Sequence, residues 1–96
     1  MKDLMVAELN RIYGELLTEN QREITTLYYD CDLSFGEIAE QKGVSRQSVN
    51  DTLNKVKAQL ELFENKLKFY KKKTELLKIA EKTPLSEKIM KILEEN

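Results

Sequence analysis

The stretch GEIAEQKGVSRQSVNDTL, residues 36–53, decides the fold. It is typical of a short helix, a glycine corner and a second helix whose outer positions are polar. Ala39, Gly43 and Val49 have the spacing A-x3-G-x5-V. A small residue at Ala39 lets two helices approach closely, Gly43 permits the sharp turn, and Val49 packs the second helix onto the first. The stretch therefore predicts a helix-turn-helix.

Capping signals divide the chain before this motif into helices. Apolar residues between positions 4 and 17 recur every three or four residues, which predicts a first amphipathic helix. Thr18 with Gln21, and Ser34 with Glu37, have the spacing of capping boxes and predict where a second and a third helix begin. Ser45 is the expected N-cap of a fourth. Three glycines and one proline in 96 residues also favour an all-α fold.

The fourth helix is expected to run unbroken from Arg46 to Lys73. Its apolar residues are spaced 4-3-4-3-4-3, and this seam needs a covering surface. They are Val49, Leu53, Val56, Leu60, Phe63, Leu67 and Tyr70. Either the last helices fold back over the seam or a second chain covers it. We favour a homodimer, whose expected contact residues are Leu60, Phe63, Leu67 and Tyr70.

The chain is expected to have two parts. Residues 1–57 form a four-helix unit that contains the helix-turn-helix, and no wing of β-strands is expected. Residues 58–96 form a helical extension with the rest of the long recognition and dimerisation helix and one or two short terminal helices. Pro84 is well placed as the first residue of a terminal helix.

The composition does not favour an enzyme. The chain has no histidine, so the usual near-neutral acid–base group and the commonest metal ligand are both missing. It also lacks a Gly-rich phosphate loop and a nucleophile elbow. Cys31 is interpreted as a half-buried structural thiol on the inner side of the second helix, and Asp30 and Asp32 as a polar helix end. We expect no catalysis, no metal and no cofactor.

Cellular location is indicated by two features. The apolar run at residues 4–7 is far too short for a secretory or membrane segment, and a single cysteine cannot form an internal disulfide. Both fit a cytoplasmic protein without a membrane partner.

The polar face of the fourth helix is the candidate nucleic-acid surface. At about 100° per residue from Val49, the outward positions hold amides, a carboxylate and hydroxyls. Gln and Asn can read adenine, Asp can accept a hydrogen bond from cytosine, and Arg46 can reach a phosphate. An ordinary solvated face has the same residue types. With the two capping serines, the candidates are Ser34, Ser45, Arg46, Gln47, Ser48, Asn50, Asp51, Asn54 and Lys55.

The charge distribution does not favour duplex binding. Residues 1–33 have a net charge of −4, residues 34–60 of +1 and residues 61–96 of +2. Modules that bind DNA usually present a clearly basic surface. One basic run surrounds Phe69 and Tyr70, and it could bind RNA or an acidic partner or simply keep the surface soluble. Its members are Lys66, Lys68, Lys71, Lys72 and Lys73.

The run LLTENQREITTLYYDCDLSFGEIAEQKGVSRQSVNDTL resembles the YlxM-like family of small bacterial helix-turn-helix proteins. The residues that carry the resemblance are Gln21, Arg22, Leu27, Tyr28, Tyr29, the run 32–40 and the run 44–51. The same motif is similar to DNA-binding region 4 of bacterial sigma factors. Asn50 departs from the bulky residue expected between Val49 and Asp51, which affects any base contact carried over to that position.

The resemblance implies a helix-turn-helix fold and a part in, or regulation of, the signal recognition particle protein-targeting pathway. In that family the gene lies beside the gene of the particle's GTPase.

Two hypotheses remain open. The first is a dimeric regulator that binds a specific DNA site. The second is an adaptor that binds the particle's RNA or its GTPase through the basic run and the helix-turn-helix face and no longer binds duplex. The acidic first third of the chain favours the second, and the intact Val-Ser-Arg-Gln corner, residues 44–47, favours the first.

Overall fold

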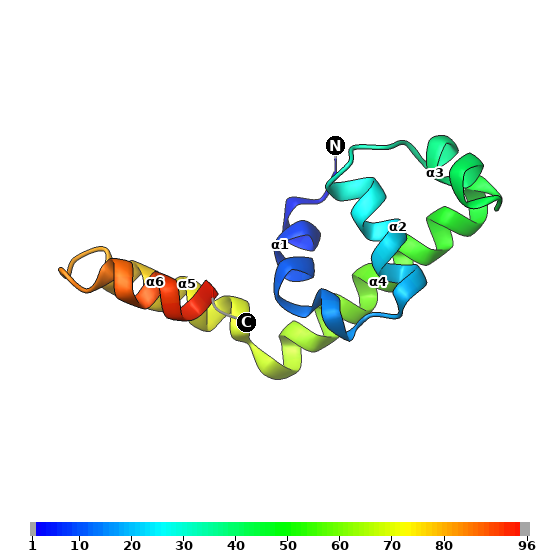
Figure 1. The fold of residues 1–96 in the computed structure, drawn as a ribbon. Helices are drawn as coiled ribbons and strands as arrows, with labels where there is room; N and C mark the ends of the chain where they lie inside the picture. Colours follow the sequence, from blue (N-terminus) through cyan, green and yellow to red (C-terminus); the bar gives the residue numbers. More distant parts are fainter. Residues whose placement is uncertain (1, 95–96) are drawn as a thin grey trace.

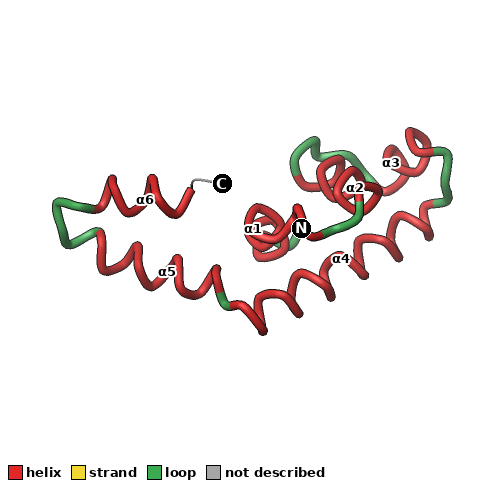
Figure 2. Tube along the Cα trace, turned by 60° about the horizontal axis from the view of Figure 1, so that its bottom comes forward, coloured by secondary structure: helices red, strands yellow, loops and turns green. Residues whose placement is uncertain are grey.

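The computed structural model describes residues 2–94, and every regular element in that range is helical. In chain order these are α1 (Leu4–Tyr13), the 3-10 turn η1 (Gly14–Leu16), α2 (Glu19–Tyr29), α3 (Phe35–Lys42), α4 (Arg46–Leu67), α5 (Phe69–Ala80) and α6 (Ser86–Glu94). The first three helices lie on one side of α4, and α5 and α6 form a hairpin arm beyond its C-terminal end (Figures 1 and 2). The predicted all-α fold with a helix-turn-helix is confirmed.

The predicted helix starts are also present. Thr18 and Ser34 each accept a hydrogen bond from the amide three residues on, and the Gln21 and Glu37 side chains return the bond, so both capping boxes form. The Ser45 hydroxyl accepts from the Ser48 amide at the start of α4. These bonds satisfy amides that have no partner inside their own helix.

Two hydrophobic clusters lie along α4. The cluster near its N-terminal end joins α2, α3 and α4 through Ile24, Ile38, Ala39, Val49 and Leu53. The second cluster joins α1 to the middle of α4 through Val6, Leu9, Tyr13, Leu17, Val56 and Leu60. One helix therefore supports both the helix-turn-helix and the N-terminal helix.

The expected dimer seam is largely covered within the chain. Leu60 has no exposed surface, and Phe63 and Tyr70 pack against the cluster that α1 forms on α4. Leu67 alone of the four remains 43% exposed. The periodicity of the sequence predicted that another surface covers the seam. That surface is α1, and not the last helices or a second chain, which were the two expected alternatives.

The prediction of an unbroken helix to Lys73 is wrong. α4 ends at Leu67, Lys68 takes a left-handed conformation with φ of 54°, and α5 begins at Phe69. The buried Tyr13 hydroxyl accepts a hydrogen bond from the Phe69 amide at 3.1 Å and donates one to Glu64 at 2.7 Å. Side chains from α1 and α4 thus cap α5 and stabilise the break.

Glu64 completes this junction. Its carboxylate also accepts hydrogen bonds from the amides of Tyr70 and Lys71, at 3.0 and 3.2 Å. Burial raises the pKa of the Glu64 carboxyl, but the bonds from Tyr13 and the two amides outweigh it, so the pKa lies below its ordinary value. Burial and the neighbouring carboxylate raise the pKa of the Tyr13 hydroxyl, which keeps its proton.

Three smaller expectations need correction or comment. Cys31 is exposed because α2 ends at Tyr29 and the chain has already turned away from the core. The terminal helix begins at Ser86 and not at Pro84, since residues 83–85 form a turn. The proposed division after residue 57 falls inside α4, and the two-part organisation stays a prediction.

Replacing Glu64 by Gln tests the junction. We expect Glu64→Gln to lower the free energy of unfolding by about 1 kcal/mol at pH 7, because one charged acceptor of the capping bonds is lost from a partly exposed site. The depressed pKa means that this stabilisation is present above the ordinary value of 4.5 and lost as pH falls through the folded-state value. Urea unfolding at pH 7 and pH 3 measures it. An equal difference between the two proteins at both pH values would contradict the assignment.

Candidate nucleic-acid interface

The turn between α3 and α4 has the geometry expected of a helix-turn-helix. Gly43 adopts a left-handed conformation with φ of 69°, and its amide donates to the carbonyls of Ala39 and Glu40. The Val44 amide donates to the Ala39 carbonyl at 3.0 Å. These bonds occupy the last carbonyls of α3 and fix the angle at which α4 leaves the turn.

The first half of α4 presents a polar face to solvent. Val49 is fully buried and Leu53 nearly so, while Asp51 between them is exposed. Eight of the nine residues proposed from the sequence are exposed, and seven of these lie on α4 or at its N-cap: Ser45, Arg46, Gln47, Ser48, Asp51, Asn54 and Lys55. Asn50 is only half-exposed, and Ser34 lies apart at the start of α3.

Some of these side chains already have partners. The Ser34 and Ser45 hydroxyls accept hydrogen bonds from backbone amides as helix caps. The Gln47 amide donates to the Asp51 carboxylate at 2.9 Å, one helical turn away. A base contact by Gln47 or Asp51 therefore requires the hydrogen bond between them to open or to be shared.

Arg46 lies against α3. A methyl group built on Gly36 would lie 2.8 Å from Nη2, 2.9 Å from Nε and 3.0 Å from Cζ of Arg46. These separations are too short, so the guanidinium occupies the space that a side chain at position 36 would fill. Gly36 thereby lets the Arg46 guanidinium lie across the first turn of α3, beside a hollow that Lys2 and Tyr28 also line.

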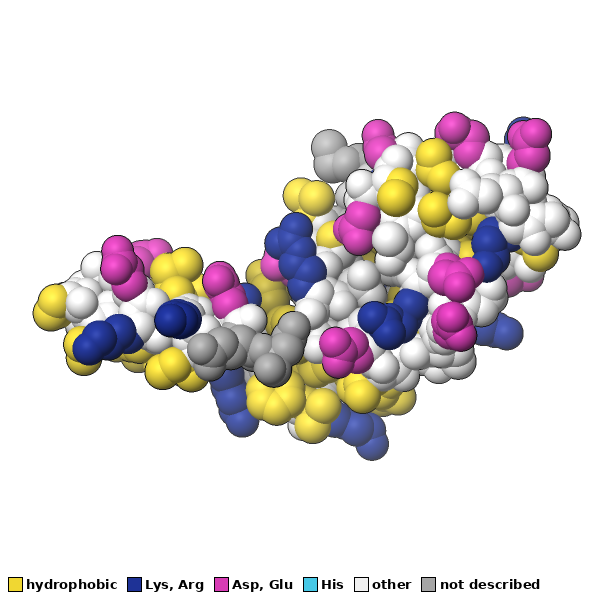
Figure 3. Space-filling view, in the orientation of Figure 1, with side chains coloured by type: hydrophobic (Ala, Val, Ile, Leu, Met, Phe, Trp, Pro, Cys, Tyr) yellow, Lys and Arg dark blue, Asp and Glu magenta, His cyan; other side chains and the backbone are white. Residues whose placement is uncertain are grey.

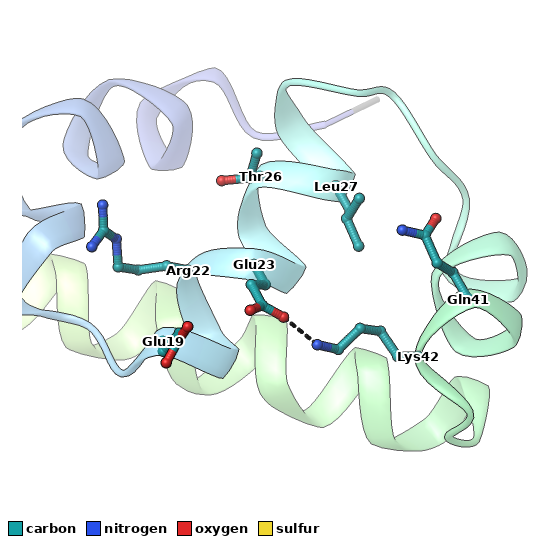
Figure 4. A pocket seen from close by; sticks show the side chains of 7 residues that line it. All are labelled: Glu19, Arg22, Glu23, Thr26, Leu27, Gln41 and Lys42. Atoms are coloured by element: carbon teal, nitrogen blue, oxygen red, sulfur yellow. Dashed lines mark hydrogen bonds and ion pairs between the residues drawn. The ribbon is translucent and has the colours of Figure 1, made fainter.

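Acidic residues neutralise two of the four basic residues in residues 34–60. Lys42 pairs with Glu23 across the pocket between α2 and α3, as Figure 4 shows. Lys57 lies 3.4 Å from Asp3. Arg46 and Lys55 form no ion pair within residues 2–94. Only these two basic side chains of the segment remain available to a phosphate.

The basic run lies at the break between α4 and α5. Lys66, Lys68, Lys71 and Lys72 are exposed around Phe69, whose side chain is 53% exposed. Lys73 is half-buried and lines a groove between the arm and α1. The break between α4 and α5 lies at the end of α4 opposite to the helix-turn-helix (Figure 1).

Sequence reasoning missed two residues that shape this surface. Gly36 follows the Ser34 cap inside the capping box, and a glycine in a short helix, where alanine is favoured, was the signal for a close approach. Glu23 carried no signal, because its partner Lys42 lies 19 positions away. Within residues 2–94, no three potential metal ligands cluster, and no helix is long and apolar enough to cross a membrane.

Comparison with known proteins links the whole chain to one family. A family profile described as "Putative helix-turn-helix protein, YlxM / p13 like" matches residues 1–96. A UPF0122 protein of Halalkalibacterium halodurans is 41% identical over 100 residues, covering 97% of this chain and 92% of that protein. One from Thermoanaerobacter sp. is 44% identical over 79 residues, covering 82% and 68%. One from Desulforamulus reducens is 54% identical over 59 residues, covering 62% and 50%.

Substitution of Gly43 tests the turn. No atom lies within 4 Å of a Cβ placed there, so Gly43→Ala is expected to cost about 1 kcal/mol of unfolding free energy through left-handed strain alone. The reverse change, Lys68→Gly, removes the same strain at the α4–α5 break and should stabilise or leave the protein unchanged. Thermal unfolding monitored by circular dichroism compares the two. A change of the melting temperature in the same direction in both variants would contradict this explanation.

Proposed function

The chain belongs to the YlxM/p13-like helix-turn-helix family, and we propose that it is a cytoplasmic, non-enzymatic regulator that binds double-stranded DNA through α4. The observation that carries the proposal is the separation of roles along this helix. Val49 and Leu53 fill the core, whereas Asp51 between them and the polar side chains of residues 45–48, 54 and 55 are exposed to solvent. A helix of this kind can enter the major groove without disturbing its own packing.

The exposed residue types suit base and phosphate contacts. Gln47 and Asn54 can each make a bidentate contact to adenine, and Asp51 can accept from the cytosine amine. Arg46, supported over Gly36 at the edge of α3, is placed to contact a phosphate beside the groove. Arg46 therefore positions the helix, and the amides and the carboxylate select the sequence.

The sparse positive charge limits the electrostatic part of binding. If Arg46 and Lys55 make the only phosphate contacts, the logarithm of the binding constant should fall against the logarithm of salt with a slope of about −2 per copy. Two copies in a two-fold dimer would double this slope and contact two half-sites. We propose such a homodimer as the active form.

We further propose that this regulator takes part in the signal recognition particle protein-targeting pathway, as the family resemblance implies. A second candidate is an adaptor that binds the particle's RNA or its GTPase. The observation that favours it is the patch of exposed lysines around Phe69, because this patch combines positive charge with an aromatic ring on which a base can stack.

A double substitution separates the two candidates. We expect Arg46→Ala/Gln47→Ala to weaken binding to a cognate duplex at least tenfold, since a bidentate base contact contributes about 1–3 kcal/mol and a phosphate contact is also lost. Fluorescence anisotropy measures this with duplex from the gene's own upstream region and with signal recognition particle RNA. Both titrations use low and near-physiological salt and unlabelled random duplex as competitor.

The matched control is Lys71→Ala/Lys72→Ala, which should leave duplex binding within about twofold apart from a weak general charge effect. Competitor-resistant duplex binding that is insensitive to the α4 substitutions would contradict the proposed face. RNA binding that only the lysine substitutions abolish, with no duplex binding, would establish the adaptor.

Gly36→Ala tests whether Gly36 positions Arg46. Alanine favours the helix by up to about 1 kcal/mol over glycine, so the unfolding free energy should stay constant or rise. The added methyl group displaces the guanidinium, so duplex affinity should fall about three- to tenfold. In an Arg46→Ala background the same change should have no effect on affinity. A loss of similar size in both backgrounds would show that Gly36 acts through something other than Arg46.

A further inference from the structure

The α5–α6 arm has almost no core of its own. Of its residues 69–94, only Ala80 is buried. The two helices have 12 and 9 residues, lengths at which helices in water depend on packing for their stability. The contacts seen within the arm do not provide that packing.

Each helix of the arm has an apolar surface wider than its partner covers. At about 100° per residue, the apolar positions of α5 span roughly 180° and those of α6 roughly 160° of the helix circumference. Leu77 and Tyr70 of α5 and Ile89 and Leu93 of α6 are the half-buried positions. They account for only part of both surfaces.

The uncovered remainder lies on one side of the hairpin. Helical periodicity and the antiparallel course of α5 and α6 put four side chains there, and Leu85 lies in the turn that joins the two helices. These five side chains, each 42–69% exposed, are called the open arm face. They are Phe69, Leu76, Ile79, Leu85 and Ile92. In Figure 3, hydrophobic side chains show on both edges of the arm, beside acidic ones on the upper edge and basic ones on the lower edge.

The shape and size of this face fit a second arm. A helix with an apolar surface of half its circumference contacts two neighbours along its length, as in a four-helix bundle. In this arm α6 covers one side of α5, and α1 contacts α5 near its N-terminal end. Five side chains of roughly 100 Å² each give about 500 Å² per copy and about 1,000 Å² for a pair, the lower limit of a specific interface. Lysine stems beside the face add to this area.

We propose that the open arm face binds the same face of a second copy, so that two arms form a four-helix bundle. This deepens the homodimer of the proposed function and assigns it to α5 and α6 in place of the seam on α4. A two-fold axis through the bundle leaves the polar face of each α4 free at the opposite end of its subunit.

The charge of the arm predicts how the pair responds to salt. Residues 68–94 contain eight lysines and four glutamates, a net charge of +4, whereas residues 2–67 have a net charge of −4. Two arms in contact repel each other, so added salt should tighten the dimer. Contact between an arm and the acidic body of a second copy would instead weaken with salt.

Sedimentation equilibrium of the full chain, without nucleic acid, tests the proposal. The wild type should dimerise, with a Kd that falls at least twofold between 50 and 500 mM NaCl by the screening of like charges. Ile79→Ser/Ile92→Ser should raise the Kd at least a hundredfold. Both side chains are about two thirds exposed in one copy, 65% and 69%, so the monomer should keep its fold and its helical circular dichroism.

Two control variants give the test its specificity. Met90→Ser removes a side chain that is 43% exposed on the other flank of α6, and Leu67→Ser changes the exposed member of the α4 seam. Both should leave the Kd within threefold.

The proposal is overturned if the wild type stays monomeric at a protein concentration of about 200 µM, or at its solubility limit if that is lower. It is also overturned if the Leu67 variant abolishes the dimer, or if salt weakens the dimer. If the monomer instead sediments with anionic vesicles in a way that requires Ile79 and Ile92, that result would assign the open arm face to a membrane and would also overturn the proposal. Because no DNA is present, these outcomes are independent of whether α4 binds duplex.

Discussion

The hydrogen bonds of Tyr13 hold the two halves of the molecule in their relative positions. Its buried hydroxyl joins α1 to Glu64 near the end of α4 and to the first amide of α5. Because the ring belongs to the cluster under α1, the same side chain covers part of the α4 seam and stabilises the break at Lys68. An unbroken helix would point the arm along the α4 axis. The capped break turns it aside and exposes its apolar face.

The two ends of α4 consequently have different roles. At the N-terminal end, Val49 and Leu53 use the inner positions and leave a polar outer face for a ligand. At the C-terminal end, Leu60 is enclosed by α1, so this part of the seam is covered within the chain. Large apolar side chains are still uncovered on the arm.

Electrostatics limits what the helix-turn-helix can do alone. Glu23 and Asp3 neutralise Lys42 and Lys57, and both acids come from the acidic N-terminal third that packs on α4. The core contacts that build the motif thus also remove much of its positive charge. In the proposed dimer, two copies would double the number of contacts with one duplex.

The sequence by itself determined the features that depend on neighbouring residues. Capping boxes, the Gly43 turn and the inward or outward direction of residues along α4 follow from spacings of three to six positions. The break at Lys68, the cover over Leu60 and the neutralised Lys42 were decided only by the tertiary structure. The break depends on Tyr13, the cover over Leu60 is α1, and Lys42 pairs with Glu23. Each of these partners lies many positions away along the chain. No local propensity encodes such contacts, because they form only once the helices have packed.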